Sequence, residues 1–136
     1  MKLTVNVDGG ARGNPGPAAI GVVVRDSDGG ILATVSETIG EATNNVAEYR
    51  ALIAGIEQAR LLGADRLELF GDSELVVKQV RGEYKVKNAG IRPLHAEVVE
   101  ALKGFGDWSI DHVRREQNAD ADALVNDALD GRESSL

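Results

Sequence analysis

The sequence predicts one α/β domain with a five-stranded mixed sheet flanked by helices. Three segments of strand character follow one another at the start of the chain, and helix-period and strand-period segments alternate after residue 43. That order favours an antiparallel three-strand meander followed by crossover units that add two parallel strands. The length of 136 residues, with 43% hydrophobic and 27% charged residues, is ordinary for one globular domain with its own core.

The predicted meander begins with residues 2–8, which alternate between apolar and polar side chains and end at Asp8. Residues 18–26 and 30–39 have the character of two more strands, joined by the tight turn “DSDGG”. Between the first two strands, the stretch “VDGGARGNPGPAAIG” holds five glycines and two prolines. A hairpin needs one or two such residues, so we expect a functional reason for this glycine-rich loop.

Helical periodicity begins at Thr43, where “TNN” supplies an N-cap, and ends at Gly63. The elements expected after the long helix are a strand over residues 65–72, a short helix over 73–82, a basic connector over 84–90, a helix over 91–106, a strand over 107–114 and a helix over 118–131. Within these elements we expect Trp108 in the core and structural roles for His95 and His112.

Asp8 and Asp72 each stand at the end of a predicted strand and beside a glycine. If the first and fourth strands are adjacent and parallel, both carboxylates lie at the carboxyl edge of the sheet, where ligands bind in open α/β folds. Two carboxylates close together repel each other unless one is protonated or a cation lies between them. Because oxygen-only sites suit magnesium or manganese, the sequence predicts a divalent metal site at this edge.

Two further acids are expected to complete this site. Glu48 lies one turn into the long helix, on the face of Leu52 and Gly55, and a glycine in mid-helix indicates close packing on the sheet. Asp122 lies one turn into the last helix. Asp120 points nearly the opposite way and is interpreted as a first-turn acid favoured by the helix dipole.

Each of these features has a structural explanation when it is taken alone. The two aspartates can be turn formers at strand ends, Glu48 a solvated helix acid, and “DADA” a first helical turn suited to the dipole. The turn “DSDGG” lacks the later ligands of a calcium loop, and “GARGNPG” lacks the lysine and hydroxyl residue of a phosphate loop. The combination of features, rather than any one of them, argues for a functional site.

The combination also resembles a known family. The segments “DGGARGNPGPAAIG”, “TNNVAEYRAL”, “FGDSELVV” and “REQNADADALVN” come in the order and at roughly the spacing of type 1 ribonuclease H domains, from Lys2 to about Leu129. The resemblance implies the ribonuclease H-like fold and an endoribonuclease that hydrolyses the RNA strand of RNA–DNA hybrids, leaving 5′-phosphate and 3′-hydroxyl ends. It implies two Mg²⁺ ions, with Mn²⁺ as the alternative, held by four catalytic carboxylates: Asp8, Glu48, Asp72 and Asp122.

The same resemblance implies where the substrate lies. Positions that touch the RNA strand or adjacent phosphates in the family are matched by Gly9, Gly10, Asn14, Asn44 and Asn45. The glycines would let the backbone meet ribose 2′-hydroxyls, the feature that separates RNA from DNA. This gives the expected functional reason for the glycine-rich loop.

The sequence departs from the better-known bacterial members in two places. The segment “HVRREQNADAD” is too short for their histidine-bearing loop, so no histidine role is carried over, and we expect Arg115 or Glu116 in that space. The large basic protrusion of some members is absent, and “KQVRGEYKVKN” is interpreted as a reduced substitute. That stretch would bring four cations near the DNA strand: Lys78, Arg81, Lys85 and Lys87.

Charge and length bear on partners and on domain organisation. A formal net charge of -7 disfavours non-specific binding of polyanions, so a nucleic acid would need a local basic patch or bridging cations. The chain has no cysteine, no signal-peptide pattern and no apolar run long enough for a membrane span, and we expect a cytoplasmic monomer without a membrane partner. Residues 1–130 are expected to form the catalytic domain. Residues 131–136 are expected to form a frayed polar tail or the start of a linker, which a C-terminal phosphatase domain follows in some members of the short-loop subgroup.

Two functions of other classes are left open by the residues. The first is a non-catalytic hybrid-binding module on the same fold, and the second is a metal-dependent phosphatase that acts on small molecules. Four intact acids argue against a pure binding module, because they would repel phosphates. The open glycine edge and the pair of asparagines favour a polymer backbone over a small molecule.

Overall fold

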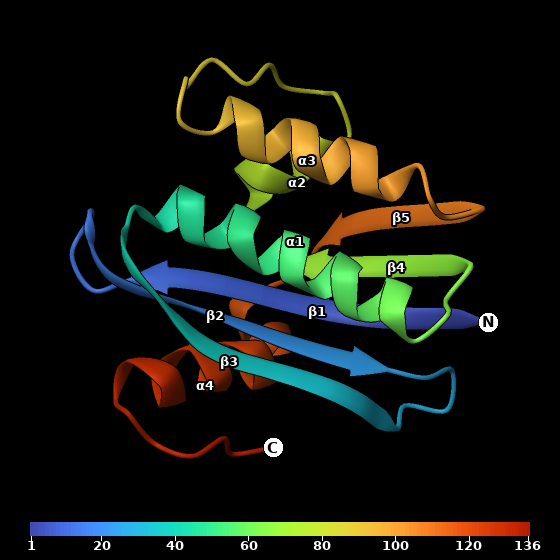
Figure 1. Ribbon diagram of the computed structural model, residues 1–136, viewed down its shortest axis with the longest axis horizontal. Coiled ribbons are helices and arrows are strands. Elements are labelled where there is room, and N and C mark those ends of the chain that lie inside the picture. Colours follow the sequence, from blue (N-terminus) through green and yellow to red (C-terminus); the bar gives the residue numbers. More distant parts are fainter.

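The computed structural model describes residues 1–136 and contains one five-stranded sheet with helices on both faces (Figure 1). No helix is both long enough and apolar enough to cross a bilayer. The elements, in chain order, are β1 (Lys2–Ala11), β2 (Gly16–Arg25), β3 (Ile31–Ala42), α1 (Asn44–Leu61), β4 (Arg66–Gly71), α2 (Glu74–Val80), α3 (Arg92–Leu102), β5 (Asp107–His112), the 3-10 helix η1 (Arg115–Asn118) and α4 (Ala119–Leu129).

The central strand of the sheet is β1. The strand order is β3-β2-β1-β4-β5, with β1 antiparallel to β2 and parallel to β4. This confirms the predicted mixed sheet, in which the first strand lies beside the fourth. The parallel pairing ends at Val7 and Gly71, whereas the pairing of β1 with β2 continues to Ala11. Asp8 is therefore the first β1 residue without a β4 partner, and Asp72 directly follows β4.

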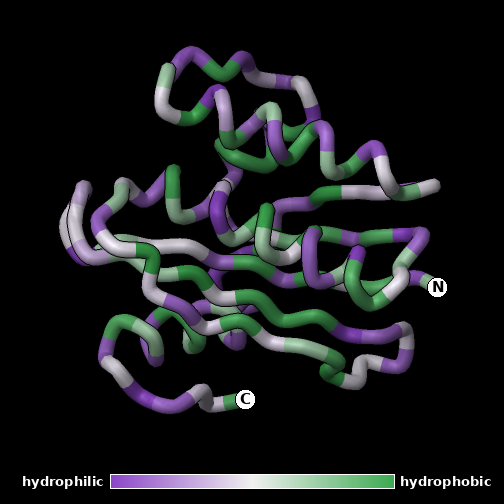
Figure 2. Tube along the Cα trace, in the orientation of Figure 1, coloured by the Kyte–Doolittle hydropathy of each residue, from purple (hydrophilic) through white to green (hydrophobic).

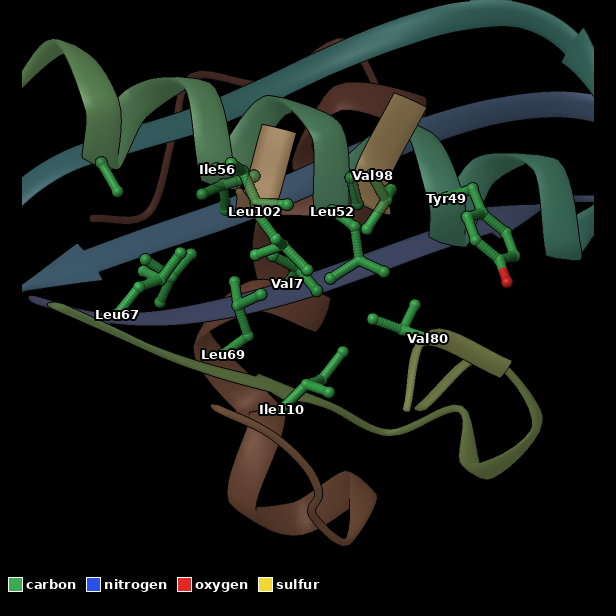
Figure 3. Close-up of a cluster of buried hydrophobic side chains, with 14 of the residues drawn as sticks. Val7, Tyr49, Leu52, Ile56, Leu67, Leu69, Val80, Val98, Leu102 and Ile110 are labelled. Carbon is green, nitrogen blue, oxygen red and sulfur yellow. The ribbon is translucent and has the colours of Figure 1, made fainter. Parts of the chain in front are cut away.

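The main core lies between the sheet and the layer of α1, α2 and α3 (Figure 3). Leu3, Val5 and Val7 project into it from alternate positions of β1, and none is more than 1% exposed. Leu52 and Ile56 of α1 pack against the same cluster. Figure 2 shows hydrophobic residues along the inner strands. Burying a side chain of this size stabilises the fold by about 1.5–3 kcal/mol, so this core fixes α1 over the sheet.

The helices α1 and α4 pack on opposite faces of the sheet. A Cβ on Gly55 of α1 would lie 2.9 Å from Cγ1 of both Val5 and Val7, which confirms the close packing predicted for this glycine. On the other face, the buried Asn118 at the start of α4 donates a hydrogen bond of 2.9 Å to the carbonyl oxygen of Val7. It also accepts one of 3.1 Å from the amide of Asn6. These contacts tie α4 to the middle of β1.

The glycine-rich stretch is mostly strand rather than loop, which corrects the expectation from the sequence. β1 continues beyond Asp8 to Ala11, and β2 begins at Gly16, so only residues 12–15 form the hairpin turn. Pairing with β2 keeps the residues after Asp8 extended. Asp8 therefore lies inside a strand, with only its β4 side open.

Two of the glycines make room for helix backbones. A Cβ on Gly9 would lie 2.2 Å from the backbone carbon and oxygen of Ala47 in α1. A Cβ on Gly21 would lie 2.2 Å from the carbonyl oxygen of Ala121 in α4. No side chain fits at such distances, so the absence of a side chain at these positions lets α1 and α4 approach the sheet.

Two smaller expectations are also corrected, and one short helix was not predicted at all. Trp108 lies near the start of the edge strand β5 and is 37% exposed, so it is not a core residue. The helix η1 was not predicted, because a single 3-10 turn has no apolar period to reveal it. The tail is anchored rather than frayed. The Ser135 amide donates a hydrogen bond of 2.8 Å to the buried carboxylate of Asp127, and Arg132 pairs with that carboxylate at 3.3 Å.

The different surroundings of two neighbouring glycines give a test of this packing. We expect Gly9→Ala to lower the free energy of unfolding by about 1–3 kcal/mol or more, because its Cβ would overlap the α1 backbone. Gly10→Ala should change it by less than about 0.5 kcal/mol, since its Cβ would meet nothing nearer than Val125, at 3.7 Å. Urea unfolding of both variants measures the difference. Equal midpoints would contradict the close approach of α1 at Gly9.

Candidate metal and nucleic-acid site

Three carboxylates from separate parts of the chain converge where the pairing of β1 and β4 ends. Asp8, Glu48 and Asp72 each offer an oxygen atom, and these atoms lie within 4.8 Å of one another. Asp8 comes from β1, Asp72 from the residue between β4 and the N-cap of α2, and Glu48 from the start of α1. Thr43 begins α1 by accepting a hydrogen bond of 3.2 Å from the amide of Val46, which fixes the turn that carries Glu48. The cluster is therefore a product of the topology and of one helix cap.

The fourth predicted acid, Asp122, approaches from α4 on the other face of the sheet. It lines the same cleft as the other three, and its proximity contributes to raising the pKa of Asp8. It lies outside the group of three, and it has neighbours of its own. Nη2 of Arg115 is 3.8 Å from Asp122, and the amide of Asn126 donates to it at 3.4 Å. The structure thus brings all four predicted acids together, with Asp122 at the margin.

The crowding changes the proton affinity of the cluster. Burial, and after it the negative charges of Asp72 and Asp122, raise the pKa of Asp8 to about 8. Burial and the two neighbouring aspartates also raise the pKa of Glu48 well above its usual range, although a hydrogen bond from the backbone of Gly9 acts in the opposite direction. In a protein without bound metal these carboxyls retain protons at a pH where free carboxyls are ionised. A divalent cation bound beside these carboxyls would favour their ionised form.

The cleft that holds the acids has a volume of about 310 Å³ and lies between the β1 edge, the start of α1, and α4. Backbone of β1 from Gly9 to Ala11 forms one wall. The Asn44 side chain accepts a hydrogen bond of 2.9 Å from the Ala11 amide, and the Asn14 side chain accepts one of 3.1 Å from the Asn44 amide. Both side chains use their oxygen inside the protein, so their NH₂ groups remain available to a ligand. Asn45 is exposed beside them.

The four cations predicted to lie near the DNA strand fall into two groups. Lys78 pairs with Glu74 at 2.8 Å and lies 5.0 Å from the centre of the Tyr84 ring. Arg81 donates a hydrogen bond of 2.8 Å to the carbonyl oxygen of Ile110 and also pairs with Asp111, so it joins α2 to β5. Lys85 and Lys87 are exposed in the connector after α2 and make no ion pair. These two lysines are the members of the predicted basic stretch that are free to meet a ligand.

Sequence reasoning gave Arg12 no role, yet Arg12 lines the cleft. The only signal was its place inside the glycine-rich motif. His95 is structural, as expected, and the structure supplies its partner. Its ring nitrogen is 3.0 Å from the carbonyl oxygen of Gln79, whose side chain accepts a hydrogen bond of 2.7 Å from Tyr49. This network joins α1, α2 and α3. His112, the last residue of β5, is exposed.

Comparison with known proteins gives consistent matches over almost the whole chain. A family model described as “Reverse transcriptase-like” matches residues 6–128. Ribonuclease HI of Halobacterium salinarum is 54% identical over 123 residues, which are 90% of this chain and 62% of that protein. Other curated relatives are matched over 37% of their length. The chain thus spans less than two thirds of the length of these relatives.

Solved structures agree with this. The crystal structure of RNase H1 from the same archaeon has a TM-score of 0.94 and 50% identity, covering 96% of this chain and 99% of that one. LC11-RNase H1, solved in complex with an RNA/DNA hybrid, has a TM-score of 0.90 and 43% identity, covering 95% of this chain and 97% of that one. The chain therefore belongs to the reverse transcriptase-like family, as a ribonuclease H domain of type 1, and the resemblance drawn from its four motifs is confirmed.

The raised pKa of Asp8 predicts how stability depends on pH in the absence of metal. The folded pKa, about 8, exceeds the ordinary value of 3.8, so between these values the folded chain binds a proton that the unfolded chain has lost. The protonated Asp8 carboxyl therefore makes its full contribution to the free energy of unfolding below pH 3.8, and this contribution is lost as the pH rises to about 8. We expect the free energy of unfolding in EDTA to fall over this window by a few kcal/mol.

Urea unfolding of the metal-free protein at a series of pH values measures this slope. Asp8→Asn should flatten the dependence of the unfolding free energy on pH. This variant should be more stable than the unaltered chain at pH 8, because the negative charge of Asp8 no longer repels the neighbouring carboxylates. Asp120→Asn, which removes an acid outside the cluster, should keep the slope. An unaltered chain whose stability does not change over this window would contradict the crowding.

Proposed function

We propose that this chain is a metal-dependent endoribonuclease that hydrolyses the RNA strand of RNA–DNA hybrids. The observation that carries the proposal is the convergence of Asp8, Glu48 and Asp72, whose oxygens lie within 4.8 Å of one another at one end of an open cleft. Two of the similar proteins support the choice of reaction and substrate. One is named Ribonuclease HI, and the other was solved in complex with an RNA/DNA hybrid.

We propose that the four acids hold two divalent ions, Mg²⁺ or Mn²⁺. The site fits such ions because its ligands are all carboxylate oxygens and because its one nearby cation, Arg115, pairs with Asp122 and not with the other three acids. When bound, the ions supply an activated water and stabilise the leaving 3′ oxygen, which gives 5′-phosphate and 3′-hydroxyl ends. Asp8, which lies between Glu48, Asp72 and Asp122, would hold the metal together with these acids.

The walls of the cleft favour a polymer over a small molecule. The β1 edge from Gly9 to Ala11 and the Asn44 side chain line the cleft beside the acids. Asn14 accepts a hydrogen bond from the Asn44 amide, and its NH₂ group is also free for a ligand. In the proposed complex this edge contacts the RNA strand, including its 2′-hydroxyls, and Asn45 lies next to it. Gly9 is also needed for the close approach of α1. A side chain at Gly10 would fit within the protein, so we attribute the absence of a side chain there to contact with the substrate.

Three finer expectations belong to the same proposal. Residues 1–130 form the catalytic unit, the unit acts as a monomer, and in a longer chain a phosphatase domain follows residues 131–136.

Removing one ligand should separate catalysis from folding. We expect Asp72→Asn to slow cleavage of an RNA–DNA hybrid in Mg²⁺ by about a thousandfold or more, since metal stabilisation of the transition state amounts to several kcal/mol. Circular dichroism should show an unchanged fold, because the change relieves repulsion. Asp120→Asn is the matched control. Asp120 pairs with Arg25 at 2.5 Å, outside the cluster, and its loss should leave the rate unchanged. Normal cleavage by the Asp72 variant would place the site elsewhere.

The exposed lysines after α2 give a separate test of the DNA-side contact. We expect the double variant Lys85→Ala, Lys87→Ala to raise KM with little change in kcat, because such contacts hold ground and transition states alike. The log–log salt slope of binding should flatten by up to about 1.8, or about 0.9 for each lost phosphate contact.

A double variant of Lys2 and Lys103 removes the same charge elsewhere and serves as the control. These lysines pair with Glu68 and Glu100, away from the cleft, and the salt slope should stay as it is. If both double variants gave the same slope, the connector after α2 would not be the DNA-side patch.

A further inference from the structure

The carboxylate cluster fills only one end of the cleft. The cleft continues along α4, past Val125 and Leu129, to the turn between β1 and β2, where Arg12 lines it. Because a strand rises about 3.3 Å per residue, Arg12 stands about 13 Å along β1 from Asp8. A strand of nucleic acid with one phosphate at the carboxylates can extend to this second end.

Arg12 is oriented by a single contact that leaves most of its donors unused. Its Nη1 donates a hydrogen bond of 2.6 Å to the carboxylate of Asp130, which follows α4. Asp130 is held from its other side by Arg132, at 3.1 Å. A guanidinium carries five N–H donors in a planar fork, and neither Nε nor Nη2 of Arg12 makes a hydrogen bond within the protein. The side chain is therefore positioned, half-exposed and only partly satisfied.

The other arginines near the site are placed differently. Arg115, the other cation that lines the cleft, lies 3.8 Å from Asp122 at the acidic end. Arg81 is occupied by Ile110 and two acids. A chain with net charge -7 and four acids in one cleft needs a cation where a phosphate backbone runs away from the metal site. Arg12 is the residue that offers one.

We propose that Arg12 binds a phosphate of the strand being cut, on the order of two to four nucleotides from the scissile phosphate, and that Asp130 positions it. The strand whose scissile phosphate lies at the carboxylates is the one that enters the cleft, so the contact is to that strand. The planar fork of arginine matches phosphate oxygens in a bidentate geometry. This inference rests on the proposed function and adds a substrate-binding residue to it.

Steady-state kinetics on an RNA–DNA hybrid at several salt concentrations provides the first test. Arg12→Ala should raise KM about tenfold at nearly constant kcat and flatten the salt slope of kcat/KM by about 0.9. Arg12→Lys should restore the salt slope, because the positive charge returns. It should reverse only part of the increase in KM, because lysine lacks the planar fork of arginine. Asp130→Asn breaks the same ion pair but keeps the cation, so it should keep or steepen the slope. Arg60→Ala, which breaks an exposed pair with Glu57 on α1, is the matched control and should change neither quantity.

A set of hybrids that each carry one neutral methylphosphonate in the RNA strand locates the contact. For the unaltered chain one position, two to four nucleotides from the cut, should raise KM, and for Arg12→Ala that same substitution should have no further effect. If the two changes multiply at every position, or if the Arg12 and Asp130 variants lose activity equally with an unchanged salt slope, Arg12 only braces the hairpin and the inference is wrong. Failure of the unaltered chain to cleave any hybrid in Mg²⁺ would instead contradict the proposed function, and the inference with it.

Discussion

The mutual repulsion of the clustered carboxylates is the constraint on which the functional account depends. Asp8 cannot move away from Glu48 and Asp72, because it is 6% exposed and lies inside a strand that is paired with β2 on one side. A buried group of like charges opposes folding. The hydrophobic core under α1 and the hydrogen-bonded sheet offset that cost. Functional sites in proteins commonly contain such unfavourable interactions, which the rest of the fold compensates. When a divalent cation binds, the same closely spaced carboxylates attract it, and their proximity increases the affinity of the site for the metal.

The glycines of β1 and β2 are part of this constraint. Gly9 admits the α1 backbone at Ala47, one residue before Glu48, and Gly21 admits the α4 backbone at Ala121, one residue before Asp122. Gly21 is also the β2 partner of Asp8. The two helices therefore reach the sheet at the points that bring their acids to Asp8. Two of the five glycines in the glycine-rich stretch therefore act through helix packing. Gly13, with a φ of 94°, and Gly16, whose Cβ would lie 2.1 Å from the carbonyl oxygen of Arg12, serve the hairpin turn, which leaves Gly10 for contact with a substrate.

Much of the architecture could be predicted because its signals are local. Alternation marked β1, helical period marked α1, and the strand order followed from the sequence of elements, which placed Asp8 and Asp72 at one edge. The rest depended on tertiary contacts that no local pattern encodes. Pairing with β2 extends β1 past Asp8, and the position of Trp108 on an edge strand exposes it. The Arg81 side chain is bound to β5 through the carbonyl oxygen of Ile110. Arg12 is held at the cleft by Asp130, because α4 ends beside the hairpin turn.

The most direct test of the account is a carboxyl-carbon NMR titration of the protein with and without Mg²⁺. Without metal, the pKa of Asp8 should be about 8, because burial, and after it the charges of Asp72 and Asp122, keep it protonated. The cluster titrates as a unit, so its resonances should shift together. With saturating Mg²⁺ the same transition should move down by several pH units, since a bound cation favours the ionised form. An Asp8 carboxyl that titrates near its ordinary value of 3.8 in both conditions would contradict the claim that this fold holds its acids close enough to require a cation.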